Sequence, residues 1–202
     1  MITEKETIKC EVIFNEERTH RFSWKRVWNK DKPMVAVVML NPCSADCVVT
    51  DTTTSLVVNN VAALEKYGGV EIVNLYSMLT SKLNFRWNSD EDLNHPENDN
   101  YIITAAKESE AVIVAWGRAA DENKRISCRV EQIMKLLEPY SEKLMCISHG
   151  ENSGFHPLTP CVRSGWTLVK FEIKKPDEKN DSEAQTDNNI EVKAEVKDVV
   201  SE

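Results

Sequence analysis

The chain has 202 residues, of which 41% are hydrophobic, and its 33 acidic and 25 basic residues give a net charge of −8. This length is enough for one domain with a full core, and we place that domain at residues 1–175. Nine acidic residues but only three lysines lie in residues 176–202, which contain no aromatic residue. We expect this segment to be a disordered acidic tail, either solubilising or able to dock a protein partner.

Without that tail, residues 1–175 carry 24 acidic and 22 basic residues and are near neutral. This balance excludes the large basic surplus of proteins that hold duplex DNA through many phosphates. No run approaches the roughly 18 apolar residues of a membrane span, and the N-terminus lacks a secretory signal pattern. We therefore predict a cytoplasmic protein that has no membrane contact.

The six cysteines are expected to be free thiols in a reducing compartment. No Cys-x-x-Cys pair is present, so the sequence predicts neither a metal nor another cofactor. The alternative is an iron–sulfur or zinc site built from Cys43, Cys47, Cys146 and Cys161.

Two strand-like segments open the chain, residues 7–14 and 18–24, and the polar connector Asn15–Glu17 predicts an antiparallel hairpin. Four continuous apolar runs follow. Such runs are typical of strands buried on both faces, and they cover residues 34–40, 70–75, 111–116 and 144–147. A last strand is expected over residues 166–173.

Helical segments separate the apolar runs. The first is expected to be capped by Thr52–Thr54 and stopped by Gly68 and Gly69 in a left-handed turn. The second would begin with the capping pair Asn98-Asp99 and run to about Ser109. The third, over residues 126–140, carries an apolar stripe made of Val130, Ile133, Met134 and Leu137. Strands alternating with helices predict a three-layer α/β/α fold with a central, mostly parallel four-stranded sheet.

Polar residues stand where the apolar runs stop. Asn41-Pro42 follows the first run, Asn74 ends the second, Trp116-Gly117 ends the third, and His149 and His156 follow the fourth. Because ligands of open α/β sheets bind beyond the carboxyl ends of the strands, we expect these residues to converge on a site. Simpler roles remain open for each: Asn-Pro is a common turn, and His156 could be an ordinary loop histidine.

A buried amide such as that of Asn74 needs hydrogen-bond partners, so it is equally compatible with a structural role and with ligand recognition. Asp46 and Asp51 are the nearest carboxylates, and either could cap the helix that starts near Thr53.

Several motifs in fixed order resemble the bacterial and phage family catalogued as domain of unknown function 1643. They span about residues 24–160 and include Leu40–Asp46, Tyr67–Gly69, Val73–Leu75, Ala115–Gly117 and His156–Leu158. The chain departs from the family pattern at Cys43, where serine is usual, and at Thr50–Thr53, where Asp-Asp-Pro-Thr is usual. It also has Gly154-Phe155 where Pro-Arg is usual, which removes an arginine available for anion contact.

The chain also resembles, more distantly, the uracil-DNA glycosylases, through the Asn-Pro loop, the strand ending in Asn, the Trp-Gly strand end and the His-Pro loop. That resemblance implies the same fold and three catalytic roles: Asn41 would orient water, His156 would stabilise the departing base, and Asp46 or Asp51 would stabilise charge. Asn74 would read the base edge. The other substrate-binding residues would be Pro42, Cys43, Ser44, Asp51, Trp116, Gly117 and Phe155.

The sequence thus favours a protein that recognises a nucleobase or nucleoside, with hydrolysis of an N-glycosidic bond as the implied activity. The expected partner is a nucleobase-containing small molecule or a single-stranded or damaged nucleic acid. The alternative is a non-catalytic protein of the same fold that binds a nucleotide or a protein partner. A third class is a hydrolase with Cys43 or Cys47 as nucleophile and His149 or His156 as base.

Overall fold

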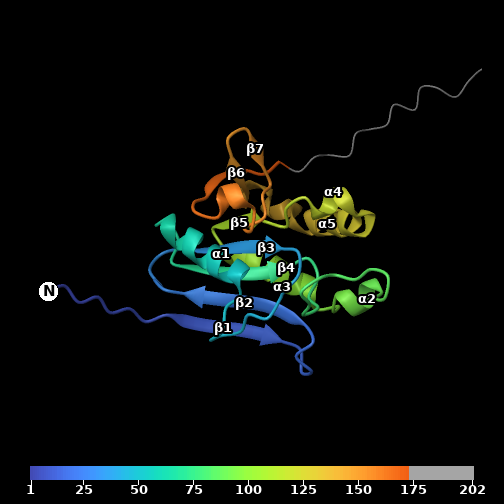
Figure 1. The fold of residues 1–202 in the computed structure, drawn as a ribbon, viewed down its shortest axis with the longest axis horizontal. Coiled ribbons are helices and arrows are strands. Elements are labelled where there is room, and N and C mark those ends of the chain that lie inside the picture. Colours follow the sequence, from blue (N-terminus) through green and yellow to red (C-terminus); the bar gives the residue numbers. More distant parts are fainter. Residues whose placement is uncertain (173–202) are drawn as a thin grey trace, which may run out of the picture.

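The structure, a computed structural model, describes residues 1–172, and a single mixed sheet runs through it (Figure 1). Hydrogen-bonded neighbours follow the order β1-β2-β4-β3-β5-β6-β7, and β8 also pairs with β6. The predicted tail at residues 176–202 and the predicted domain boundary lie outside the described residues. Within residues 1–172, no helix combines the length and apolar character needed to cross a membrane.

The four apolar runs form the parallel centre of this sheet, as predicted. They are β3 (Met34–Met39), β4 (Gly69–Asn74), β5 (Ala111–Val114) and β6 (Leu144–His149). β3 lies between β4 and β5, and all these neighbours run parallel. The predicted sheet of four strands was too small, because antiparallel strands at the margins bring the total within residues 1–172 to eight.

The predicted N-terminal hairpin is confirmed as β1 (Lys9–Phe14) and β2 (Arg21–Val27), and β2 pairs antiparallel with β4. Its register shifts between Ile13 and Phe14, so Phe22 has no direct partner in β1. Such a bulge changes which face the following side chains point to. Phe22 stacks on Tyr101 of the helical layer on one side, whereas Arg21 points to the opposite face, toward Asn74.

Helices cover both faces of the sheet and create two cores. One core contains Val57 and Val61 of α1 (Thr52–Ala63). Val162 and Trp166, which follow β6 in the chain, pack into the same core. The other contains α3 (Asn98–Glu108) and α5 (Lys124–Leu137). Alternate residues of the central strands enter the two cores, as expected for strands buried on both faces.

Short elements connect these layers. They are α2 (Asp90–Leu93), α4 (Ala119–Glu122), the 3-10 helices Glu138–Lys143 and Pro160–Val162, β7 (Asn152–Ser153) and β8 (Thr167–Lys170).

The helix ends differ in detail from the prediction. Asp51, not the threonines, caps α1, and the left-handed residue after it is Glu65 (φ 57°) rather than a glycine. Gly68 is needed for another reason: a Cβ there would lie 1.8 Å from the carbonyl oxygen of Asn29. Asn98 does not cap α3 either, because its side chain is buried and bonds the end of β4.

Candidate functional site

The carboxyl ends of the parallel strands define one edge of the sheet, and the connections diverge there. α1 follows β3 on one face, while α3 and α5 lie on the other. A sheet wound in this way has its topological switch point beside β3, between strands whose connections leave in opposite directions. The loop after β3, residues 40–51, starts at this point.

Asn41 is half-buried, and its side chain links this loop by hydrogen bonding to the segment after β4. Its Nδ2 donates to the carbonyl oxygen of Thr80 at 2.7 Å and lies 3.3 Å from that of Pro42. The amide nitrogen of Thr80 donates back to the Pro42 carbonyl at 3.1 Å. The donor atoms of Asn41 therefore stabilise the loop, and its Oδ1 is the atom left for a ligand or water among the described contacts.

Both nearby carboxylates are occupied by backbone groups. Asp46 accepts hydrogen bonds from the amides of Val48 and Val49, each at 2.8 Å. These bonds, the one from Val49 foremost, lower the pKa of Asp46, and the positive charge of Arg18 adds to the effect. Asp51 accepts from the amide of Thr54 at 2.7 Å and caps α1. Of the two predicted capping carboxylates, Asp51 caps the helix and Asp46 caps the turn before it.

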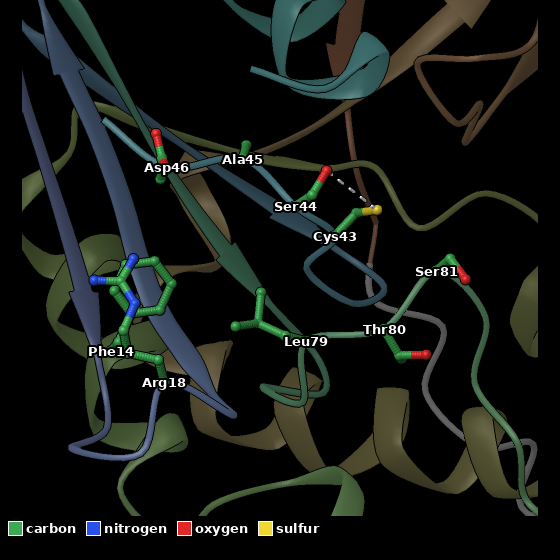
Figure 2. A pocket seen from close by; sticks show the side chains of 9 residues that line it. All are labelled: Phe14, Arg18, Cys43, Ser44, Ala45, Asp46, Leu79, Thr80 and Ser81. Atoms are coloured by element: carbon green, nitrogen blue, oxygen red, sulfur yellow. Dashed lines mark hydrogen bonds between the residues drawn. The ribbon is translucent and has the colours of Figure 1, made fainter. Parts of the chain in front are cut away.

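A pocket of about 370 Å³ opens beside this loop (Figure 2). Phe14 and Arg18 of the hairpin lie on one side and Leu79 lies near the middle. The pocket includes three of the predicted site residues among its lining, which consists of Phe14, Arg18, Cys43, Ser44, Ala45, Asp46, Leu79, Thr80 and Ser81. Its walls thus combine an aromatic ring, aliphatic carbon and several hydroxyl groups.

Arg21 lies behind the wall of this pocket and was missed by the sequence reasoning. Its side chain is 1% exposed and donates to the carbonyl oxygen of Ala45 at 3.1 Å and to Oδ1 of Asn74 at 3.3 Å. Burial lowers the pKa of Arg21 to about 10, against the opposing effects of Asp51 and Cys43. No carboxylate within residues 1–172 forms an ion pair with it, and its Nε has no hydrogen-bond partner.

Asn74 is buried at the end of β4, and its amide is only partly used. Oδ1 accepts from Arg21, whereas Nδ2 has no partner among the described residues. The backbone carbonyl of Asn74 accepts from Asn98 at 2.9 Å. A buried, unpaired amide is costly, so this corner of the site holds polar groups beyond what the fold itself satisfies.

The other predicted residues lie at the ends of β5 and β6 and do not line the pocket. A Cβ on Gly117 (φ +69°) would lie 2.9 Å from Cβ of His156, so this predicted pair is in contact. Burial lowers the pKa of His156, and its Nδ1 accepts from the amide of Leu158 at 3.1 Å. Trp116 is buried in the core with α5, and Phe155 packs against the opposite core. Phe155 therefore contributes to packing.

The cysteine alternatives have no geometric support. All six thiols are free, and no group of three His, Cys, Asp or Glu side chains within residues 1–172 is placed to hold a metal ion. Among the described contacts, the Cys43 thiol lies beside the Ser44 hydroxyl at 3.9 Å and the Cys47 thiol beside the Cys10 carbonyl. Neither thiol is hydrogen-bonded to His149 or His156.

Sequence comparison adds one result to this geometry. The chain matches the family described as "Protein of unknown function (DUF1643)" over residues 21–158. The chain belongs to this family. The matched segment starts at Arg21 and includes the loop after β3, Asn74 and the Gly117–His156 contact. No curated protein and no solved structure matches the chain.

Proposed function

We propose that this DUF1643 protein binds a nucleobase-containing ligand in the pocket beside the loop after β3. The observation that carries the proposal is the pocket itself. Its volume of about 370 Å³ lies in the usual range for small-molecule sites, roughly 300–1,000 Å³. A nucleobase has an apolar face and a polar edge, and the pocket offers apolar side chains and hydroxyl groups close together.

The two kinds of wall come from different elements. Phe14 supplies an aromatic ring, over which Arg18 places its guanidinium 4.3 Å from the ring centre. Leu79 adds aliphatic surface. A planar arginine–aromatic pair and an aliphatic side chain are suited to contact the face of a base.

The hydroxyl groups suit the polar edge of a base. Ser44 is exposed, and among the described hydrogen bonds its hydroxyl takes part only in the one with the Cys43 thiol. Ser81 is also exposed and lines the same pocket, while the hydroxyl of Thr80 is bonded to the backbone of Lys82. Ser44 and Ser81 therefore remain available as donors and acceptors.

The charge around the pocket favours a small ligand or a single strand over duplex DNA. Arg18 and Asp46 carry opposite charges at the pocket, and Arg18 contributes to lowering the pKa of Asp46. Duplex binding generally requires several cations directed at the phosphates, and among residues 1–172 Arg18 is the one cationic side chain in the lining.

The geometry favours binding over hydrolysis. The Asp46 carboxylate, expected to stabilise charge, and the Nδ2 of Asn41 are engaged by backbone groups, so of the Asn41 amide Oδ1 is the atom that remains to orient a water among the described contacts. His156 lies against Gly117, outside the pocket lining. The distant resemblance to uracil-DNA glycosylases supports the nucleobase class, and hydrolysis of an N-glycosidic bond becomes an outcome for the same experiment to decide.

The test is a thermal-shift panel of free bases, nucleosides, nucleotides and short single-stranded oligonucleotides. A ligand present at about 100 times its dissociation constant should stabilise the protein by about 2.7 kcal/mol. Chromatography of each stabilising nucleoside or nucleotide then shows whether free base is released. Stabilisation without release is the expected result, and release would establish the hydrolase instead.

A matched pair of variants locates the binding. Ser44→Tyr fills the pocket from an exposed position, whereas Ser153→Tyr places the same side chain on exposed β7, away from the pocket. We expect the first variant to lose the ligand-induced shift and the second to keep it. If no compound in the panel stabilises the protein, or if Ser44→Tyr responds like the wild type, the proposal is wrong.

A further inference from the structure

Two cysteines from separate elements meet beside the pocket loop. Cys10 is half-buried in β1. Cys47 is exposed and directly follows Asp46 in the loop after β3. The Sγ of Cys47 lies 3.7 Å from the carbonyl oxygen of Cys10. A thiol from the loop therefore reaches the backbone of a strand that precedes it by 37 positions in the sequence.

The surroundings of these thiols also include an arginine. Arg26 lies directly opposite Cys10 in the β1–β2 pairing. Burial raises the pKa of Cys10 and the Cys47 thiol raises it further, whereas the side chain of Arg26 lowers it. Within residues 1–172 the Nε of Arg26 is buried without a hydrogen-bond partner, and its guanidinium lies over Trp24 at 4.8 Å. Burial and Cys47 outweigh Arg26, so the net effect favours the thiol form of Cys10, and Cys47 is the exposed member of the pair that an oxidant reaches first.

This thiol pair is connected to the pocket wall. The indole Nε1 of Trp24 donates to the backbone carbonyl of Asp46 at 2.8 Å, so β2 already holds the loop at the residue before Cys47. Ala45 and Asp46 line the pocket itself. A covalent bond between Cys47 and Cys10 would thus fix one wall of the pocket to the β1–β2 hairpin.

We propose that Cys10 and Cys47 are a redox pair that forms an intramolecular disulfide between β1 and the pocket loop. The inference goes beyond ligand binding and does not depend on the ligand. The observations that support it are the 3.7 Å contact between the two residues and the exposure of Cys47. Reversible disulfides in otherwise reduced proteins are usually regulatory.

Hydrogen peroxide is a sufficient oxidant. The exposed Cys47 thiolate attacks one peroxide oxygen, which forms a sulfenic acid and releases hydroxide. The Cys10 thiol then attacks that sulfur, the S–S bond forms, and the sulfenic oxygen leaves as water after it takes up a proton. Overall, two thiols and one peroxide give one disulfide and two waters, and the two sulfurs lose two electrons. A dithiol reductant reverses the change by thiol–disulfide exchange.

The experiment treats the full chain with hydrogen peroxide, blocks remaining thiols with iodoacetamide and maps the peptides by mass spectrometry. We expect a Cys10–Cys47 linked peptide that disappears after treatment with dithiothreitol. The closed loop of about 38 residues should raise Tm by on the order of 5–10 °C. This rise should be absent in Cys47→Ser.

Cys128→Ser is the matched control, because Cys128 is exposed on α5 and lies on the other core's helical layer. It should form the linked peptide as the wild type does. The proposal is overturned if iodoacetamide alkylates both Cys10 and Cys47 after the peroxide treatment, or if Cys47 links to Cys43 or to a second chain. None of these readouts uses a nucleobase ligand, so failure here and failure of the binding proposal are distinguishable.

Discussion

The two halves of the carboxyl edge of the sheet use their polar residues differently. At the ends of β3 and β4, Arg21 and Asn74 are buried and incompletely paired, and a pocket opens beside them. At the ends of β5 and β6, Gly117 and His156 are packed against each other, and Trp116 belongs to the core. The half at β3 and β4 therefore keeps unpaired hydrogen-bonding groups among the described residues, whereas the half at β5 and β6 is close-packed.

Position at a strand end is therefore not sufficient to identify a ligand-binding residue. A close-packed side chain contributes mainly through its shape, so replacing it changes mainly the stability of the fold. An unpaired buried polar group instead lowers stability in the absence of a partner.

The largest effect is expected at Arg21. Arg21→Met removes the donors to Ala45 and Asn74 and leaves two buried oxygens unpaired. We expect the free energy of unfolding to fall by about 3 kcal/mol, measured by urea denaturation. Arg86→Met is the control, because Arg86 is exposed and only stacks over Trp87 at 5.2 Å. Equal stability of the two variants would show that Arg21 does not hold the loop.

The next effect concerns the close-packed half. Gly117→Ala places a methyl group 2.9 Å from Cβ of His156 at a residue with φ +69°. The left-handed backbone and the crowding together should cost about 2 kcal/mol, the lower end of the range for each. Gly154→Ala separates the two contributions, because Gly154 has φ +81° with nothing within 4 Å of the added Cβ. Thermal denaturation should therefore show a larger loss for Gly117→Ala, and equal losses would contradict the packing argument.

The sequence predicted the centre of this molecule better than its edge. Four mostly apolar runs identify the parallel strands because burial on both faces disfavours polar residues, with Glu71 and Asn74 of β4 as the buried polar exceptions within residues 1–172. The facing direction of Arg21 could not be predicted in the same way. It depends on the bulge at Phe22, which arises from how β1 pairs with β2 and not from any periodicity in β2 alone.

The candidate site was predicted in part for a similar reason. The loop at Cys43–Asp46 follows directly from the end of a buried strand, and all four of its residues line the pocket. The opposite walls come from Phe14 and Arg18 in the hairpin and from residues 79–81. Phe14 ends β1, whereas Arg18 and residues 79–81 lie in polar connections without a repeating pattern, so only the three-dimensional pairing of β2 with β4 reveals that they face the loop.

The smallest effect is a difference in pH dependence between the two halves. Burial lowers the pKa of His156 below its ordinary value of 6.5, so the unfolded chain binds this proton more readily than the folded one. Stability should therefore fall as the pH drops from about 7 to about 5. The pKa of Asp46 is lowered from 3.8, so the stability it contributes is present above that pH and is lost only as the pH falls further.

Urea denaturation at a series of pH values separates these two windows. In His156→Gln the decrease between about pH 7 and pH 5 should be smaller than in the wild type, because the replacement does not titrate. Exposed His149, replaced in His149→Gln, is the matched control and should leave that decrease intact. In Asp46→Asn only the decrease below about pH 4 should become smaller. If the stability of His156→Gln falls as much as that of the wild type between about pH 7 and pH 5, the buried His156 is not the source of this pH dependence.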